Sequence, residues 1–214
     1  MTTTPFRPPV PERLILNGPV GDLEAILEVP ECHDGVRAAL VCHPHPLHGG
    51  TLQNKVVHMT ARALQERGIA TLRFNFRGVG GSAGVFDDGR GETDDALAAA
   101  DWLSARYPRA PLIMAGFSFG AYVAYRIAAV RPVERLYMIA PPIRRFAFDN
   151  HPLTTAPTLV IQGDSDELVD HASVAAWADA LHPKAQLDTI VGAQHFFHGR
   201  LNELKGSVQA FLDR

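Results

Sequence analysis

Short apolar runs alternate with amphipathic segments along most of this chain. After residue 37 the apolar runs contain few polar residues, which is typical of strands buried on both faces of a sheet. The segments between them have apolar positions three or four residues apart and predict helices. The expected strands are 38–42, 69–76, 112–117, 135–140, 158–162 and 187–191. The expected helices are 55–67, 94–107, 121–129, 171–181 and 201–212.

The first thirty residues have a different pattern. Residues 1–12 contain four prolines, which remove backbone donors, so we expect an extended N-terminal arm ahead of a domain formed by residues 13–214. Residues 14–16 and 23–29 predict two strands joined by a Gly/Pro turn. Acidic residues among their apolar positions indicate one solvent-facing side, as at the edge of a sheet.

Repeated strand–helix units predict an α/β fold with a mostly parallel sheet and helices on both faces. Connections between parallel strands are right-handed, and each places its helix against the sheet. The chain has 214 residues and is 46% hydrophobic, which suits one globular domain. Because such sheets bind ligands beyond the C-terminal ends of their strands, we expect the chemistry of this chain at that edge.

The net charge and the length of the apolar runs indicate which classes of binding partner to expect. Twenty basic and twenty-three acidic side chains give a net charge of −3 without an extended basic cluster, which argues against nucleic acid. No apolar run reaches bilayer length and the N-terminus does not resemble a signal peptide, so we expect a cytoplasmic protein without a membrane partner.

Cys32 and Cys42 are the two cysteines, and the apolar surroundings of Cys42 indicate a buried thiol. A monomer and a homodimer are equally compatible with the sequence.

The segment Gly116-Phe117-Ser118-Phe119-Gly120 lies between an expected strand and an expected helix. A Gly-x-Ser-x-Gly pattern in this context is typical of a nucleophile elbow, a sharp turn that exposes the serine hydroxyl. The two glycines let the helix and a neighbouring strand approach without Cβ clashes. The Phe119 N–H, at the helix start, is expected to point toward an anion beside Ser118 Oγ. The alternative is a glycine-flanked turn with a serine that only caps the helix.

Carboxylates and imidazoles follow the last two expected strands. Asp164 and Asp166 come after one of them, and His195 and His198 come after the other. Because parallel strands end at one edge of the sheet, these side chains can meet Ser118 there, in the chain order Ser, Asp, His. A serine hydroxyl needs a neutral histidine to take its proton and a carboxylate to hold the imidazole tautomer. Asp164 can instead cap the loop through backbone N–H groups, and His198 can instead lie at the start of the last helix, without a catalytic role.

Five motifs at the expected strand ends are 43–50 (HPHPLHGG), 73–80 (RFNFRGVG), 116–120 (GFSFG), 163–166 (GDSD) and 195–197 (HFF). In this combination the sequence resembles the α/β-hydrolase superfamily, and within it the small, lidless bacterial serine hydrolases akin to carboxylesterases and dienelactone hydrolase. The resemblance implies an eight-stranded sheet with one antiparallel strand near the start. It also implies Ser118 as nucleophile, Asp166 as acid and His195 as base. Dienelactone hydrolase has cysteine as its nucleophile, so its particular reaction is not implied.

Residues 43–50 follow the first fully apolar strand, where this fold places its second oxyanion donor. The two prolines of the segment have no N–H, which leaves the backbones of His45, Leu47 and His48. We expect the His45 N–H to act together with the Phe119 N–H. The side chains expected to line the substrate pocket are His43, Leu47, His48 and Phe117.

Two further sequence patterns, a histidine spacing and a glycine-rich segment, do not by themselves indicate a particular function. The histidines of residues 43–50 are spaced as in some zinc sites, but a hydrolytic metal site needs further ligands, so we expect no metal and no other cofactor. Residues 77–84 are rich in glycine without the pattern of a phosphate-binding loop. We expect Arg77 to pair with Asp94 or Asp95, with direct substrate binding as the alternative.

The segment 141–157 is too short and too rich in proline for the helical cap that many relatives insert at this position. An open site suits small acyl esters better than long-chain lipids. The sequence therefore predicts a serine carboxylesterase that forms an acyl-Ser118 intermediate. Thioesters or small peptides as substrates, and a non-catalytic binding protein with this fold, remain as alternatives.

Overall fold

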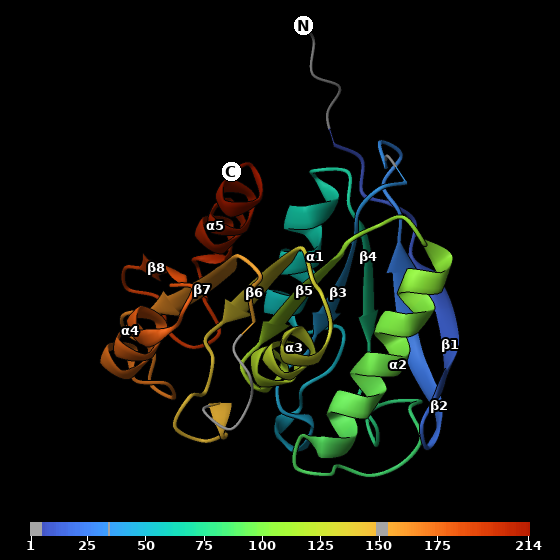
Figure 1. Cartoon of the computed structure of the whole chain (residues 1–214), viewed down its shortest axis with the longest axis horizontal. Coiled ribbons are helices and arrows are strands. Elements are labelled where there is room, and N and C mark those ends of the chain that lie inside the picture. Colours follow the sequence, from blue (N-terminus) through green and yellow to red (C-terminus); the bar gives the residue numbers. More distant parts are fainter. Residues whose placement is uncertain (1–5, 34, 149–153) are drawn as a thin grey trace, which may run out of the picture.

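In the computed structural model, which describes residues 6–33, 35–148 and 154–214, eight strands form one sheet between two layers of helices (Figure 1). Their order across the sheet is β1-β2-β4-β3-β5-β6-β7-β8. The strands are β1 (Glu12–Gly18), β2 (Gly21–Glu28), β3 (Ala38–Cys42), β4 (Ala70–Phe74), β5 (Leu112–Phe117), β6 (Arg135–Ile139), β7 (Thr158–Gly163) and β8 (Gln186–Ile190). The helices are η1 (Pro46–His48, a 3₁₀ turn), α1 (Lys55–Gln65), α2 (Arg90–Arg106), α3 (Phe119–Val130), α4 (His171–Ala180) and α5 (Leu201–Leu212).

The sheet is parallel except at β2. This strand pairs antiparallel with β1 on one side and with β4 on the other, whereas all other neighbouring strands are parallel. The tight turn between β1 and β2 is closed by the pairing of Gly18 with Gly21. The predicted mostly parallel, eight-stranded α/β fold is therefore confirmed.

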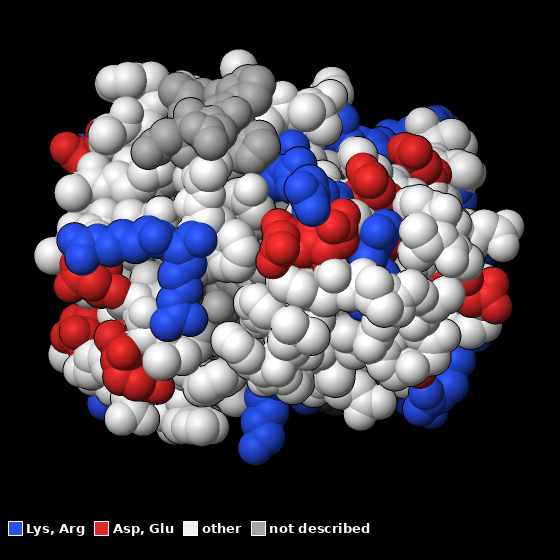
Figure 2. All heavy atoms as spheres, turned by 90° about the horizontal axis from the view of Figure 1, so that it is seen from below, with Lys and Arg blue, Asp and Glu red and all other residues white. Residues whose placement is uncertain are grey.

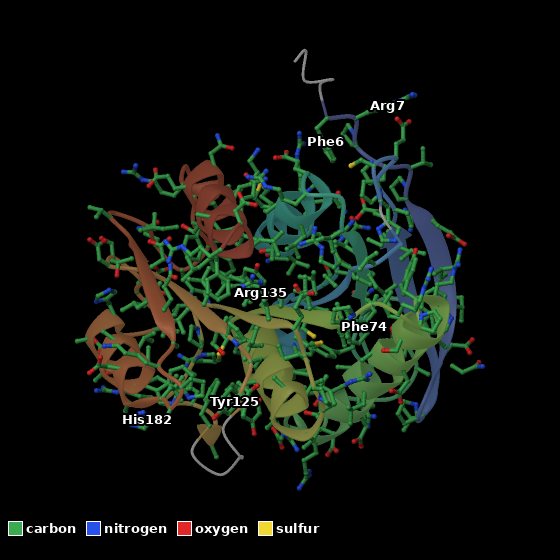
Figure 3. All side chains as sticks on the ribbon, turned by 45° about the horizontal axis from the view of Figure 1, so that its top comes forward. Phe6, Arg7, Phe74, Tyr125, Arg135 and His182 are labelled. Carbon is green, nitrogen blue, oxygen red and sulfur yellow. The ribbon has the colours of Figure 1, made fainter. Side chains whose placement is uncertain are left out.

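The helices cover both faces of the sheet. One core lies between the sheet and helices α2, α3 and α4, and the other lies between the sheet and helices α1 and α5. Figure 1 shows α2 and α3 in front of the sheet and α1 behind it, and in Figure 3 the two groups of helices lie on opposite sides of the strands. Phe74 of β4 and Tyr125 of α3, both labelled in Figure 3, are buried in the first core.

Burial along the strands follows the apolar pattern of the sequence. All residues of β3, β4, β5 and β7 are buried, as continuous apolar runs predict. The edge strands β1 and β8 each keep solvent-exposed positions. The central strands are therefore fixed tightly on both faces, and their C-terminal ends hold the loops that carry the candidate chemistry.

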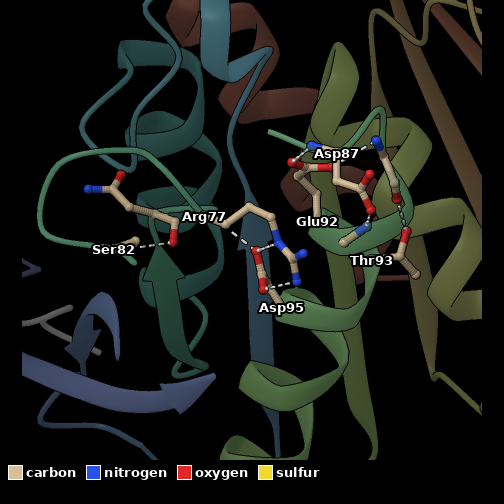
Figure 4. Close-up of polar contacts among 9 residues, drawn as sticks. Arg77, Ser82, Asp87, Glu92, Thr93 and Asp95 are labelled. Atoms are coloured by element: carbon tan, nitrogen blue, oxygen red, sulfur yellow. Dashed lines mark hydrogen bonds and ion pairs between the residues drawn. The ribbon is translucent and has the colours of Figure 1, made fainter. Parts of the chain in front are cut away.

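Several element boundaries differ from the prediction, and the largest shift is four residues at the start of α2. Strand β4 ends at Phe74, two residues earlier than expected; Asn75 N–H still donates to the Glu24 carbonyl of β2, and the Asn75 side chain accepts a hydrogen bond from Leu52 N–H. Helix α2 begins at Arg90, four residues before the expected start. The Glu92 carboxylate accepts the N–H groups of Asp87 and Gly89 at 2.9 and 2.8 Å and stabilises this extra turn (Figure 4).

The N-terminal segment is only partly described. Residues 1–5 of the expected arm lie outside the described residues, residues 6–11 have no regular secondary structure, and β1 begins at Glu12. Figure 3 labels Phe6 and Arg7 of the described part, where the Arg62 guanidinium lies 5.8 Å from the Phe6 ring. Among the described residues, no helix has both the length and the apolar character needed to cross a membrane. Cys42 is a free, buried thiol, as predicted.

Candidate active site

Ser118 occupies a strained turn between β5 and α3. Its backbone has φ 53° and ψ −118°, a conformation that is uncommon for any residue other than glycine. Ser118 N–H donates to the Ile139 carbonyl at the end of β6, which ties the turn to the sheet. A strained residue held by its surroundings at a strand end is the arrangement expected of a nucleophile elbow.

Gly116 and Gly120 make this turn possible. A Cβ atom at Gly116 would lie 2.0 Å from the Gly120 carbonyl oxygen, and a Cβ atom at Gly120 would lie 2.3 Å from the Cys42 carbonyl oxygen. No side chain fits at these distances from backbone atoms. The close approach of α3 to β5 and β3 therefore requires both glycines, as the sequence predicted.

Ser118, His195 and Asp166 lie in hydrogen-bonding contact. His195 Nε2 is 3.2 Å from Ser118 Oγ, and His195 Nδ1 is 2.8 Å from Asp166 Oδ2. The three residues come from the ends of β5, β7 and β8, which meet at one edge of the sheet. His195 is 3% exposed, so its ring is held in position by packing.

The Asp166 carboxylate is held in its ionised form. Burial acts to raise its pKa, but the hydrogen bond with His195 and those from the N–H groups of Val169 and Leu168 outweigh this and leave the pKa below its usual range. Gln162 Nε2 donates to the same oxygen that faces His195. This set of donors keeps the negative charge directed at the imidazole.

The two residues that competed with Asp166 and His195 in the sequence lie elsewhere. Asp164 Oδ1 accepts hydrogen bonds from Gly192 N–H and Ser165 Oγ, so this carboxylate caps the loops after β7 and β8. His198 stacks on Phe196 and lines a separate hollow. The geometry therefore places Asp166 and His195, and not the alternatives, beside Ser118.

Of the three candidate N–H donors in the loop after β3, one makes no hydrogen bond to a described residue. Leu47 N–H donates to the His45 ring, and His48 N–H donates to the His45 carbonyl, as does that of Gly50. The His45 N–H makes no such bond with a described residue. Phe119 is the first residue of α3, where N–H groups have no partner inside the helix. Both amides predicted to stabilise an oxyanion are thus available.

Three of the four side chains predicted to line the pocket do not do so. His43 is fully buried, and its ring bonds the Pro44 carbonyl and Phe76 N–H instead of facing the pocket. Phe117 is 1% exposed because it packs in the core behind His195. Leu47 is 68% exposed on the outside of the loop. His48 lines the pocket as predicted, stacked on His45.

A pocket of about 180 Å³ opens beside Ser118 and His195. Figure 2 looks onto this face, where groups of acidic and basic side chains lie among larger uncharged areas. Sequence analysis missed the lining residues after β6, because no motif marks that segment and only the fold brings it to Ser118. The described lining residues are Pro44, His45, His48, Gly49, Gly50, Asn54, Ser118, Phe119, Pro142, Arg145, Phe146, Leu168, Val169, His195 and Phe196.

Arg77 ties the glycine-rich loop of residues 77–84 to helix α2. Its guanidinium pairs with Asp95 of α2 at 2.8 Å, and Asp95 also accepts the Arg77 N–H (Figure 4). Ser82 Oγ donates to the Asn75 carbonyl in the same loop. Arg77 is buried, which confirms the structural role favoured by the sequence and not contact with substrate.

Within the described parts of the chain, no three His, Cys, Asp or Glu side chains lie together as metal ligands would. In the histidine loop the reason is geometric. Both ring nitrogens of His43 are engaged inside the core, while His45 and His48 stack face to face on the surface. The zinc-like spacing therefore does not bring the three imidazoles to a common centre.

Comparison with known proteins places this geometry in a family. The family model for X-Pro dipeptidyl-peptidase (S15 family) matches residues 23–153, which include Ser118. The chain belongs to this family of α/β serine hydrolases. A serine hydrolase without a lid from Xanthomonas campestris is 45% identical, with a TM-score of 0.91 over 99% of this chain and 97% of the other.

Other relatives of this hydrolase agree with that assignment. An α/β serine hydrolase homologue from Coxiella burnetii is 41% identical, with a TM-score of 0.90 over 94% of this chain and 97% of its own. An uncharacterized protein of Rickettsia prowazekii (strain Madrid E) is 37% identical over 94% of this chain and 88% of its own length. These relatives therefore identify the chain as an α/β serine hydrolase homologue with a lidless fold, and the substrate has to be argued from the site.

Proposed function

We propose that this protein is a carboxylesterase that hydrolyses small carboxylic esters through an acyl-Ser118 intermediate. The observation that carries the proposal is the continuous hydrogen-bonded series from Ser118 Oγ through the His195 ring to Asp166. The strained backbone of Ser118 and the small pocket beside it support the same assignment.

The geometry supports a two-step reaction. His195 Nε2 takes the proton of the Ser118 hydroxyl while Oγ attacks the ester carbonyl, and Asp166 stabilises the imidazolium that forms. The N–H groups of His45 and Phe119 bind the oxyanion. His195 then gives its proton to the leaving alcohol, and water repeats the sequence to release the acid and restore the serine.

An ester fits the pocket better than a peptide with a free N-terminus. Release of a dipeptide requires a partner for the substrate's ammonium group, and that partner is normally a carboxylate. The described residues that line the pocket include no Asp or Glu. Dipeptide release, the activity in the name of the matching family, therefore has no evident ammonium site among these residues.

The test compares purified protein with its Ser118→Ala variant on p-nitrophenyl acetate and butyrate in the presence of EDTA. We expect hydrolysis by the unmodified protein to survive chelation and the variant to lose at least roughly 10⁴-fold in kcat, because Ser118 carries the one hydroxyl or thiol among the described residues that line the pocket. Activity that persists in Ser118→Ala, or that EDTA alone abolishes, would refute the mechanism. No turnover by the unmodified protein would favour a binding protein.

Asp166→Asn and Asp164→Asn provide a matched pair in the same assay. Asparagine at 166 can present an amide in place of the carboxylate and disfavour the productive His195 tautomer, so kcat should fall by roughly 10³-fold or more. Asparagine at 164 should leave kcat within a few-fold, since Asp164 contacts only loop atoms. Equal effects of the two substitutions would contradict the assigned role of Asp166.

A further inference from the structure

Arg145 is a permanent positive charge on the wall of the pocket that holds Ser118. It lies in the segment after β6 and lines the pocket next to Pro142 and Phe146. We propose that Arg145 makes this site selective for esters that carry a carboxylate near the scissile bond. This inference rests on the proposed esterase function and adds to it the charge of the substrate.

The pocket wall supplies no negative charge to neutralise Arg145. The polar side chains in its described lining are Asn54, Ser118 and three histidines, of which His195 is engaged with Asp166. The rest of the lining is apolar or glycine. Within this described lining a substrate carboxylate would therefore meet a guanidinium and no carboxylate, whereas Asp170 lines the adjoining hollow and Asp88 acts on His45 from outside the lining.

The acidic side chains nearest to this wall along the chain already have partners. Glu167 accepts the backbone N–H of His195 at 3.1 Å. Asp170 caps α4 through Ser173 N–H and lies 3.9 Å from the Arg144 guanidinium. Arg145 itself makes no ion pair with any residue that the structure describes. Of these two adjacent arginines, one is thus paired within the fold and the other is directed to the pocket.

The charge of Arg145 acts across the pocket. The pKa of the His45 imidazole lies below its usual range, first because of burial and then because of electrostatic repulsion from the neighbouring His48 and Arg145 side chains, with Asp88 acting in the opposite direction. His45 carries the backbone N–H assigned to the oxyanion. Arg145 therefore influences the same space in which the ester carbonyl would be bound.

Arg145 also lines a second hollow that adjoins the pocket with Ser118. The pocket with Ser118 and a second hollow of about 190 Å³ share Pro142, Arg145, Leu168 and Val169 in their linings. Arg144 lines only the second hollow. An ester bound at Ser118 can thus place a carboxylate on Arg145 with either its acyl or its alcohol part, and a guanidinium binds a carboxylate through two parallel hydrogen bonds.

The test uses two pairs of esters that differ only in charge. Monomethyl glutarate and methyl glutaramate differ at the end of the acyl chain, and carboxymethyl and carbamoylmethyl butanoate differ at the end of the alcohol. We expect the unmodified protein to favour the carboxylate member of at least one pair by roughly two- to five-fold in kcat/KM, the range of an exposed ion pair. Salt should weaken this preference because it screens the charges.

Arg145→Gln should bring the ratio within that pair close to one, Arg145→Lys should keep part of it, and the matched control Arg144→Gln should keep all of it. Each ratio is measured within one protein, so differences in folding or overall activity cancel. Equal rates within both pairs for the unmodified protein, or an unchanged preference in Arg145→Gln, would overturn the inference.

Failure of the esterase proposal gives a different result. In that case none of the four esters is hydrolysed, and the binding of glutarate and glutaramate, measured by calorimetry, decides the role of Arg145. Tighter binding of glutarate that is lost in Arg145→Gln supports an anion-selective pocket, whereas equal binding overturns it.

Discussion

At the scale of single residues, His43 shows how a buried histidine supports the site without touching it. A backbone N–H can only donate a hydrogen bond, so Phe76 N–H makes Nε2 the unprotonated nitrogen of His43, and Nδ1–H donates to the Pro44 carbonyl at 2.6 Å. That carbonyl and the His45 N–H belong to one planar peptide group. The His43 ring therefore orients the amide that we assign to the oxyanion.

Acid should destabilise the protein through His43. Burial lowers its pKa to about 4, with the hydrogen bond to Pro44 opposing the effect, whereas a histidine in the unfolded chain titrates near 6.5. Below about pH 6.5 the unfolded state binds a proton that the folded state does not, so this stability is complete above pH 6.5 and decreases toward pH 4. Between pH 8 and pH 5 this residue should cost about 2 kcal/mol of unfolding free energy.

Urea unfolding of the unmodified protein and of His43→Gln, at pH 8 and at pH 5, tests this expectation. Glutamine does not titrate, and its side-chain oxygen can accept the Phe76 N–H. The variant should therefore lose about 2 kcal/mol less than the unmodified protein on acidification, even if it is less stable at pH 8. The same loss in both proteins would show that His43 is not the responsible group.

At the scale of elements, the site depends on how closely α3 approaches two strands. Gly120 lies against the carbonyl groups of Cys42 and His43 at the end of β3, and Gly116 lies against the first turn of α3. Strand β5 can therefore continue directly into α3, which aims the start of the helix and its free N–H groups at the space beside Ser118. Packing of backbone against backbone positions the nucleophile.

Two glycine-to-alanine substitutions in helices should have opposite effects. Gly120→Ala should lower the unfolding free energy by about 3 kcal/mol, because the new methyl group overlaps the backbone of β3. Gly206→Ala in α5 should raise it by about 0.5–1 kcal/mol, because alanine restricts the unfolded chain and, apart from its neighbours and the backbone of α5 itself, no described atom lies within 4 Å of the new Cβ. Denaturant midpoints measure both, and a similar effect of the two substitutions would contradict the packing argument.

At the scale of the whole molecule, the described part of the connection between β6 and β7 forms a wall of the site and contains no helical cap. Only residues 140–157 connect these strands, and their described part contains no α-helix. Leu168 and Phe196, which line the pocket, keep part of their surface exposed. An acyl chain longer than the pocket would extend into solvent and gain little binding energy from its outer methylene groups.

A chain-length series of p-nitrophenyl esters from acetate to octanoate measures this consequence. We expect kcat/KM to be highest for acetate or butyrate and to decrease toward octanoate, when each ester is kept below the concentration at which it aggregates. Faster turnover of octanoate would show that the chain forms a longer acyl site than the described pocket, and would refute the open-site argument.

Much of this architecture was predictable because it depends on local pattern. Fully buried parallel strands require continuous apolar runs, and the segments 38–42 and 112–117 were placed to the residue. The elbow was predictable for the same reason, since Ser118 and its two glycines lie within five residues of one another. By contrast, α2 began earlier than expected because the Glu92 carboxylate bonds N–H groups of the preceding loop.

The lining of the pocket was predicted less well. His43 and Phe117 lie next to the chemistry in sequence but point into the core, because successive residues at a strand end face opposite sides of the sheet. Arg145 and Phe146 lie in the pocket although no motif marks them. Which side chains face a cavity depends on how several loops meet, and no single segment contains that information.

By itself, the sequence determined the α/β class, the order of the strands and helices along the chain, and the strand ends that carry Ser118, Asp166 and His195. These features follow from the periodicity of burial and from local backbone chemistry. Only the tertiary structure decided that Asp166 and not Asp164 faces His195, that the His45 N–H stays available, and that Arg145 stands at the pocket wall. The physical reason is that hydrogen-bond geometry and exposure arise between segments distant in sequence, once the packed sheet has brought them together.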